Sequence, residues 1–516
     1  MSNSNNNNQT REKLNHSRGL GLLERYQVSK QLANVYGTLL LSAHIQLDYP
    51  LPFNNNNNNN NNDNDNVDRY LYNKLSRAIQ LLCNEQPLLS VTIADIETTT
   101  PRFNPIDSID YNDLVTVDHG IAFFDDTVLT SVLEKEIGTD FDLTSKTVPL
   151  WRLHILTHQD RSTELFVILT VHHVISDGLS TTIILSRLLE LLNQPETKTE
   201  TESNDNDENG QDGATNNNNN IIIDNSTKLN ESLDKRTPHH PTAMDLLPII
   251  IKHKLLPSFI TRYFEVPFWA GQTPAVKQTH NTLVRVFEIP ADKFTKLLNK
   301  CKLEKTTPHA AIYISTILAN LIALSQDTMS LRTCTPINAR SLCVPEAPQS
   351  EVGNFVGSFD RSKSYSATIL RESNQFWEAC REYKTDLAAS SIGAIKSTNM
   401  LHYVGDFPSK WIEFWTSKLT STPMGRSCSF EVSDVGRWGQ QQQQQQTSQP
   451  QQWKLISSTY AQSANVYGST FNINLVSVCG SSRATCTWQK GSVDENTIQT
   501  IIDNILQSLD NCIHSN

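Results

Sequence analysis

The sequence lacks the long apolar run that a membrane-spanning helix requires. About 20 consecutive apolar residues are needed to cross a bilayer, and the best candidate, residues 310–324, contains Asn320 and fits a buried helix. The first 13 residues are rich in asparagine and contain no apolar stretch, so they do not predict a secretory signal. We therefore expect a cytoplasmic protein.

Three further absences exclude other classes of protein. None of the nine cysteines forms a C-x-x-C pair, which argues for free thiols and against structural zinc. No stripe of basic residues is present, so nucleic acid is not an expected partner. The net charge is −11, and more than half of it comes from residues 195–229, which contain eight acidic residues and two lysines. No G-x-S-x-G occurs, so a serine hydrolase has no support.

Polar tracts divide the chain of 516 residues. Low-complexity runs of this kind bury too little apolar surface to offset their ordering entropy, so we expect them to be disordered loops. The predicted organisation is a disordered tail over 1–17, an N-terminal half over 18–193, a disordered acidic insert over 194–235 and a C-terminal half over 236–516. An Asn-rich insert lies at 54–66 and a Gln-rich insert at 440–452.

The alternation of predicted strands and helices indicates the fold class. Strands are predicted at 35–45, 88–96, 150–156, 164–171, 281–289, 329–336, 427–432, 464–478 and 484–489, and helices at 67–83, 179–192, 291–301, 308–325 and 495–512. Because both kinds of element recur along the whole chain, we predict an α/β (α+β) protein with two halves, each a mixed sheet covered by helices.

The apolar stretch at 246–264 has two interpretations. It is interrupted by Lys252, His253, Lys254 and Pro257, and fits a pair of helices that face the core. The alternative is peripheral contact with a membrane surface.

One segment carries a chemical pattern. Residues 164–171 are the most strand-like in the chain, and this strand ends at His172 and His173. A histidine at the end of a buried strand is held firmly and can point into a crevice. Its unperturbed pKa of about 6.5 suits proton transfer near neutral pH.

The turn after these histidines contains Asp177 and Gly178. Glycine tolerates positive φ and lets a ligand approach the backbone. The helix predicted at 179–192 has Ser180 or Thr181 as its expected N-cap. The whole pattern is H-H-x-x-x-D-G between a strand and a helix. A structural histidine pair in a turn is the alternative, whereas a metal site lacks a nearby Cys or Glu cluster.

This pattern resembles the CoA-dependent acyltransferase superfamily, which includes chloramphenicol acetyltransferase, plant BAHD acyltransferases and peptide-synthetase condensation domains. The chain is most similar to the alcohol acetyltransferase branch. That likeness runs in order from about residue 18 to residue 510, and its softer segments are residues 20–26 (LGLLERY), 149–153 (PLWRL), 335–340 (TPINAR), 353–357 (GNFVG) and 430–436 (FEVSDVG).

The resemblance implies roles for particular residues. His173 would be the general base, at a tunnel between two similar halves that CoA enters from one face and the acceptor from the other. Asp177 would hold the turn through an arginine, and Arg340 matches that partner, although it could also be a surface arginine after a strand. Asn354 and Ser433 are candidate oxyanion donors or tunnel residues, and each could equally be a turn residue.

The activity implied is transfer of acetyl from acetyl-CoA to an alcohol hydroxyl, by a monomer. An acyl-CoA would be the co-substrate, and no metal or bound cofactor is expected. Three alternatives stay open: an amine acceptor such as a sphingoid base, a condensation-type domain acting on carrier-bound thioesters, and a catalytically inactive binding protein of the same fold.

Overall fold

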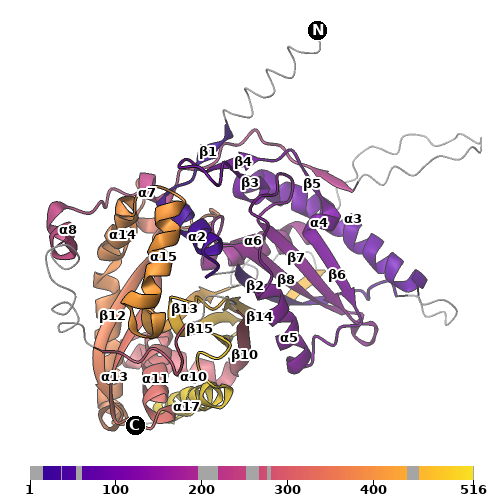
Figure 1. The fold of residues 1–516 in the computed structure, drawn as a ribbon. Coiled ribbons are helices and arrows are strands. Elements are labelled where there is room, and N and C mark those ends of the chain that lie inside the picture. Colours follow the sequence, from indigo (N-terminus) through magenta and orange to yellow (C-terminus); the bar gives the residue numbers. More distant parts are fainter. Residues whose placement is uncertain are drawn as a thin grey trace, which may run out of the picture.

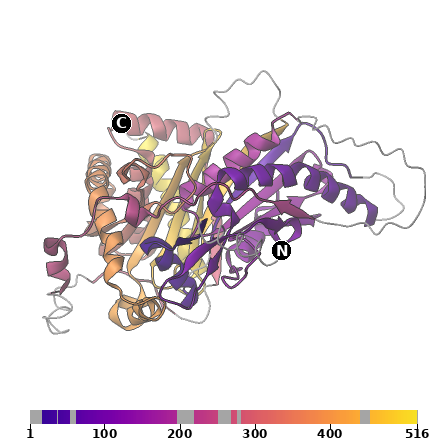
Figure 2. The ribbon, with the colours of Figure 1, turned by 90° about the horizontal axis from the view of Figure 1, so that it is seen from above.

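Two large mixed sheets organise the protein, one in each half (Figure 1). The computed structural model describes residues 16–35, 38–53, 61–195, 219–250, 267–275, 281–438 and 452–514. Seen from above, the N-terminal elements and the C-terminal elements lie side by side (Figure 2). The prediction of mixed sheets covered by helices is confirmed.

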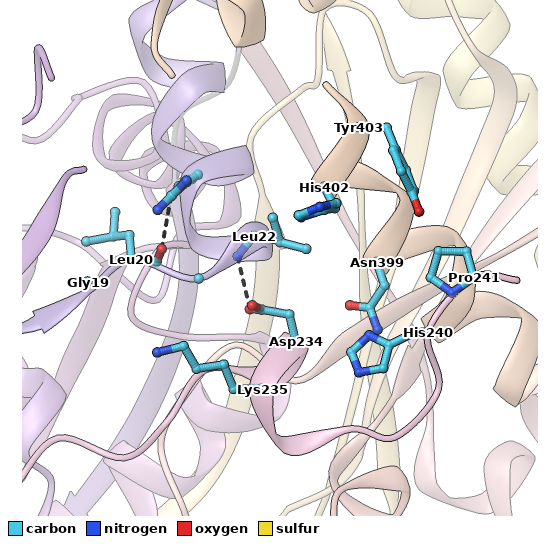
Figure 3. Close-up of a pocket in the computed structure, with 12 residues that line it drawn as sticks. Gly19, Leu20, Leu22, Asp234, Lys235, His240, Pro241, Asn399, His402 and Tyr403 are labelled. Atoms are coloured by element: carbon cyan, nitrogen blue, oxygen red, sulfur yellow. Dashed lines mark hydrogen bonds between the residues drawn. The ribbon is translucent and has the colours of Figure 1, made fainter. Parts of the chain in front are cut away.

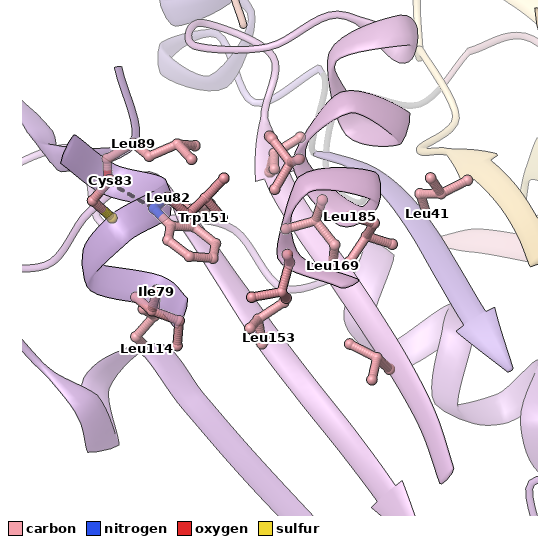
Figure 4. Close-up of a cluster of buried hydrophobic side chains, with 14 of the residues drawn as sticks. Leu41, Ile79, Leu82, Cys83, Leu89, Leu114, Trp151, Leu153, Leu169 and Leu185 are labelled. Atoms are coloured by element: carbon pink, nitrogen blue, oxygen red, sulfur yellow. Dashed lines mark hydrogen bonds between the residues drawn. The ribbon is translucent and has the colours of Figure 1, made fainter. Parts of the chain in front are cut away.

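The N-terminal half contains a five-stranded sheet. Its strands, in spatial order, are β14 (Trp453–Gln462), β2 (Thr38–Leu47), β8 (Glu164–His172), β7 (Trp151–Thr157) and β6 (Val115–His119). Helices α3 (Asn61–Glu85) and α6 (Gly178–Leu192) bury one face of this sheet, and α5 (Asp126–Ile137) packs on the other. Figure 4 shows Leu153 and Leu169 of neighbouring strands beneath Leu185 of α6. These buried leucines hold β8, and hence the histidine pair, against the helix layer.

The C-terminal half contains a six-stranded sheet. Its strands, in spatial order, are β10 (Thr282–Ile289), β16 (Ser481–Gln489), β15 (Ser469–Val478), β13 (Cys428–Arg437), β11 (Thr328–Asn338) and β12 (Val356–Ser366). The helices that build a second core against one face are α10 (Ala291–Leu303), α11 (Pro308–Ala323), α13 (Ser373–Ala389) and α17 (Glu495–His514). Thr307 caps α11, since its hydroxyl accepts from the backbone N–H of Ala310 at 3.2 Å.

Shorter elements complete the structure. The strands are β1 (Arg18–Gly19), β3 (Val91–Ala94), β4 (Arg102–Pro105), β5 (Ser108–Asp110) and β9 (Asn220–Ile222). The helices are α2 (Leu22–Leu32), α4 (Tyr111–Leu114), α7 (Leu233–Arg236), α8 (Ala243–Ile250), α12 (Ala367–Leu370), α14 (Ser391–Asn399) and α15 (Ser409–Ser421). In the parts of the chain with described structure, we find no helix that combines the length and apolarity needed to cross a bilayer.

Strand β14 connects the halves, because it belongs to the C-terminal part of the chain but completes the N-terminal sheet. It pairs antiparallel with β2, from Trp453 opposite Leu47 to Gln462 opposite Leu39. The strand predicted at 464–478 is observed as β15, which begins five residues later, whereas β14 is not predicted. The chain turns at 463–468 and enters β15 in the other sheet. Asn465 and Gly468 lie in this crossover, and residues of these types are typical of turns.

Two other predictions need correction. Within the insert expected to be disordered over 194–235, residues 219–235 are ordered: β9 pairs with β5, and Ile221 and Ile223 are buried. Three consecutive isoleucines supply the apolar surface that the rest of the insert lacks. The strand predicted at 88–96 is shortened, because a 3₁₀ turn (Pro87–Ser90) precedes β3.

Several predictions fall partly outside the described residues. The tail is described only from residue 16, and residues 196–218 of the acidic insert lie outside the described residues. The Gln-rich tract is described only at its last residue, and of the apolar stretch at 246–264 only the part within α8 is described. The Asn-rich insert is described from Asn61, where α3 begins, six residues before the predicted start of that helix.

Candidate active site

The loop between β8 and α6 carries the histidine pattern, and Asp177 fixes its end. Asp177 is the N-cap of α6: its Oδ1 accepts from the backbone N–H of Ser180 and from the Ser180 hydroxyl, both at 2.7 Å. The expected cap at Ser180 or Thr181 is therefore wrong by three or four residues. A carboxylate satisfies the free N–H groups of a first helical turn well, and it also favours the positive end of the helix dipole.

Gly178 is required for a different reason from the one expected. The φ angle of Gly178 is not positive, so the backbone conformation here does not require a glycine. A Cβ added at this position would lie 2.8 Å from Cγ1 of Val435 and 2.9 Å from Oη of Tyr460. The glycine therefore allows strands β13 and β14 to approach the start of α6.

The two histidines face different environments. His172 is fully buried beside Phe141, with ring centroids 6.1 Å apart, and its Nδ1 accepts from the backbone N–H of Val174 at 3.0 Å. Burial lowers the pKa of His172 to about 3, so the ring is neutral and belongs to the core. His173, in contrast, is half-buried and retains access to solvent.

Asn354 holds His173. The Asn354 amide donates from Nδ2 to the backbone carbonyl of His173 at 2.7 Å, and the same nitrogen lies 3.3 Å from Nδ1 of the ring. Burial, together with the charge of Lys30, lowers the pKa of His173 to about 4, although hydrogen bonds with the backbone at His173 and Ser176 act in the opposite direction. The ring is therefore neutral at pH 7 and able to accept a proton.

Asp177 and Arg340 form a buried pair between the halves. Nη1 of Arg340 donates to Oδ2 of Asp177 at 2.9 Å, and Nη2 donates to Oδ1 at 3.2 Å. Arg340 also donates to the carbonyl of Glu351 and lies over the ring of Phe355 at 4.7 Å. Arg340 is thus in the core, not at the surface.

The segment that contains Asn354 is attached to the same loop. The backbone N–H of Asp177 donates to the carbonyl of Gly353, and the backbone N–H of Phe355 donates to Oδ2 of Asp177, both at 3.0 Å. Three consecutive residues of the C-terminal half therefore position the histidine loop of the N-terminal half.

Ser433 lies on the other side of the helix start. It is buried on β13 and forms a hydrogen bond with the hydroxyl of Tyr460, whose pKa is raised by burial. Tyr460 reaches this place on β14 and would contact any side chain at position 178. The sequence gives no signal for Tyr460, because its role depends on the crossover of β14.

Lys30 is a second residue that the sequence does not single out. It is 6% exposed on α2 and lies 4.7 Å from the ring centre of Tyr26 and 5.5 Å from that of Trp415. Burial lowers the pKa of Lys30 to about 8, against the opposing charge of Glu431. Its charge also lowers the pKa of both His172 and His173.

Two other histidines in the described residues have structural contacts. His154 is buried between Glu136 and Asp118, 3.0 Å from each carboxylate. His309 lies 3.1 Å from the hydroxyl of Tyr383. In the described residues, no group of three or more His, Cys, Asp and Glu side chains is arranged to hold a metal ion.

Comparison with known proteins gives a consistent result. A family model described as alcohol acetyltransferase matches residues 69–512. A probable alcohol acetyltransferase of Fusarium pseudograminearum, FCK4, is 23% identical over 449 residues, which is 82% of each chain.

Solved structures show the same fold at low identity. Trichothecene 15-O-acetyltransferase TRI3 from Fusarium sporotrichioides aligns with a TM-score of 0.67 and 11% identity, over 96% of this chain and 95% of that one. The epimerization domain from the third module of tyrocidine synthetase B aligns with a TM-score of 0.57 and 12% identity, over 96% and 97% of the two chains.

Proposed function

Since the chain belongs to the alcohol acetyltransferase family and is an acyltransferase, we propose that it transfers acetyl from acetyl-CoA to an alcohol, with His173 as the general base. The observation that carries this proposal is the placement of His173. It is a half-buried neutral imidazole at the end of a buried strand, held by Asn354 from the opposite half.

The ring orientation favours one nitrogen as the base. Hydrogen bonds with the backbone at His173 and Ser176 favour the protonated ring, so we propose that Nδ1, the nitrogen nearest the backbone, carries the proton and leaves the lone pair of Nε2 free. We assign Nε2 as the atom that receives the acceptor proton. Which nitrogen of a histidine is protonated depends on the hydrogen bond that the other makes.

The proton must move during the attack, because an imidazole with this pKa is too weak to deprotonate an alcohol beforehand. The alcohol oxygen bonds to the thioester carbonyl carbon while its hydrogen passes to Nε2. Base catalysis of this kind contributes about 10²- to 10⁴-fold. The tetrahedral intermediate then breaks its carbon–sulfur bond, and the leaving thiolate takes the proton back from the imidazolium. The thioester is already activated, so the reaction needs no enzyme nucleophile.

The oxyanion of the intermediate requires hydrogen-bond donors. Ser433 and its partner Tyr460 are the donors we propose, because both lie at the start of α6. Asn354, the other candidate, already donates to the carbonyl of His173. We therefore assign Asn354 to positioning of the base.

A thiol-release assay with purified protein tests the proposed function. Acetyl-CoA or a carrier-bound acetyl thioester is supplied with a panel of alcohols, a panel of amines, or no acceptor, and the free thiol is measured together with the acylated product. Ester formation with at least one alcohol supports the proposal. Amide formation alone, transfer only from carrier-bound thioesters, or no transfer at all would overturn it.

A further inference from the structure

A second recess lies outside the histidine loop, where the start of α2 meets α7 and the end of α14. Its volume is about 480 Å³, which falls within the range of about 300 to 1,000 Å³ for small-molecule sites. Elements from three separate parts of the chain line it, as Figure 3 shows. None of the residues assigned above to the reaction lines this recess.

One wall of the recess presents a buried acceptor without a partner. Asn399 is 2% exposed, and its Nδ2 donates to the carbonyl of His239 at 2.9 Å, which fixes the orientation of the amide. Its Oδ1 has no hydrogen-bond partner in the described structure. Figure 3 shows this oxygen directed into the recess, on the side of Asp234. An unsatisfied buried carbonyl is unfavourable, so a ligand with an N–H or O–H donor is favoured there.

The same wall offers aromatic surface. His402 and Tyr403 lie edge to face with ring centroids 5.3 Å apart, and Tyr403 is 58% exposed. Exposed aromatic faces bind flat ring systems by stacking, because each π-face is apolar and polarizable. The Asn399 oxygen and these rings therefore favour a planar group that bears a donor.

The opposite wall carries two cations, Arg25 and Lys235, beside one carboxylate, Asp234. Lys235 lies away from Asn399 and Tyr403 in Figure 3, and Arg25 lines the recess with its Nε donating to the carbonyl of Leu20 at 3.0 Å. Lys235 also pairs with Glu231 at 3.1 Å, but both side chains are more than half exposed. A solvent-exposed ion pair of that kind contributes little to stability, so Lys235 can exchange it for an anionic ligand.

The backbone N–H groups at the start of α2 are not the groups that would bind an anion. Oδ1 of Asp234 accepts the backbone N–H of Leu22 at 3.0 Å, and a side-chain oxygen of Glu24 accepts that of Gly21. Cationic side chains and the Asn399 oxygen remain as the groups that would recognise a ligand.

We propose that this recess binds an adenine nucleotide group, with the exocyclic amine on Asn399 Oδ1, the base against Tyr403 and His402, and phosphate at Arg25 and Lys235. Two sources carry this group: the nucleotide end of CoA, or a free adenine nucleotide. The first source rests on the proposed function, whereas the second does not.

Equilibrium binding to the full-length protein tests the proposal without turnover. Adenosine 3′,5′-bisphosphate is titrated calorimetrically into wild type, Arg25→Gln, Lys235→Gln and Lys302→Gln. Removing one charge-assisted contact should weaken binding about tenfold. Lys302→Gln is the matched control, because Lys302 is exposed on α10 and does not line the recess. Arg25→Lys should restore most of the affinity if charge is what matters.

A second ligand tests the Asn399 contact without changing the protein. Purine riboside 5′-phosphate lacks the exocyclic amine and should bind about tenfold more weakly than AMP, as expected when a buried acceptor loses its donor. No binding, equal affinity of the two nucleotides, or equal affinity of Lys235→Gln and Lys302→Gln would overturn the proposal.

Competition in the inactive His173→Ala variant separates the sources. If CoA displaces the bisphosphate, the recess holds the nucleotide end of the co-substrate. If both bind together, it holds a free nucleotide. Both outcomes support the recess as a nucleotide site, and neither depends on acyl transfer, so failure of the proposed function would show separately as absent thiol release.

Discussion

Arg340 donates from its two terminal guanidinium nitrogens to the two carboxylate oxygens of Asp177, at 2.9 and 3.2 Å. The side chain of Arg340 is 0% exposed and that of Asp177 is 2% exposed. The pair connects the loop after β11 to the first turn of α6, and thus the two halves of the protein. Since the same carboxylate caps α6 and accepts from Phe355, this contact helps to set the orientation of the histidine loop, together with the hydrogen bonds from Asn354 and to Gly353.

Loss of either partner should destabilise the protein severely. Removing one member of a buried ion pair leaves the other charge uncompensated, which costs about 3 to 5 kcal/mol. Asp177→Ala and Arg340→Ala should each lower the free energy of unfolding by this amount, and activity should fall with it. Urea denaturation followed by circular dichroism measures the change. A double variant that is much less destabilised than the sum of the singles would confirm the coupling, whereas additive effects would contradict it.

His173→Ala should reduce kcat/KM by at least about 10²-fold without loss of the fold, because it removes the proposed proton acceptor. His172→Ala is the matched control, since it deletes the neighbouring ring from the core and should act on stability more than on chemistry. Acetyl transfer and thermal melts are measured on both. A folded His173→Ala enzyme with near-normal turnover would exclude the base assignment.

The acid limb of the kcat/KM profile should lie at a lower pH than an unperturbed histidine would give. A base must be neutral, and burial and Lys30 lower the pKa of His173 to about 4. The kcat/KM profile of the free enzyme should therefore stay level from pH 7 down to near pH 5, where an unperturbed histidine would already be mostly protonated. Lys30→Met removes one cause of the shift and should move the limb to higher pH. An acid limb at about 6.5 in the wild-type enzyme would contradict this prediction.

Gly178→Ala should impair both stability and activity, because the new methyl group would lie 2.8 Å from Val435 and 2.9 Å from Tyr460. Overpacking of this kind costs about 1 to 3 kcal/mol. Val435→Ala in the same chain removes the closer obstacle and should recover part of the melting temperature. Gly393→Ala is a suitable control, since a Cβ there meets nothing within 4 Å. Equal melting temperatures for the two glycine variants would show that the close approach is absent.

The contact between His154 and Glu136 should make stability depend on pH. Burial would raise the pKa of Glu136, but the hydrogen bond to His154 and the charge of Arg152 lower it to about 2. Burial would lower the pKa of His154, but Glu136 and Asp118 raise it above 6.5. The carboxylate contribution is lost as pH falls from 4.5 towards 2, and the histidine contribution is lost as pH rises through its raised pKa.

The difference in melting temperature between wild type and His154→Gln should therefore be greatest between pH 4.5 and 6.5. Melts in a series of buffers check this. A difference that does not vary between pH 3 and 9 would show that the ion pair adds nothing to stability.

Local chemistry made part of the site predictable. The β-branched run before His172, and the Asp-Gly turn after it, place the histidines at the end of a strand that is observed as β8. The helix that follows is observed as α6, one residue earlier than predicted. Such features depend on residues close together in the chain, where side-chain periodicity and capping preferences apply directly.

Contacts between distant segments could not be derived in this way. Tyr460 and Lys30 lie in segments whose patterns resemble any partly buried strand or helix, and only the packing of β14 and α2 brings them near the histidine loop. Asn354 was nominated, but its hydrogen bond to the His173 carbonyl depends on how the two halves meet. Tertiary packing, not local preference, decides these positions.

The position of β14, which comes late in the chain but completes the N-terminal sheet, has a consequence for biosynthesis. The ribosome releases β2, which ends at Leu47, long before its neighbour β14, which begins at Trp453, so one edge of β2 stays unpaired through most of translation. Exposed strand edges are templates for aggregation, and this one can be covered only when nearly the whole polypeptide is made. Truncation before Trp453 removes β14 together with β15, β16 and α17, and should yield insoluble protein that co-expression of residues 452–516 in trans rescues.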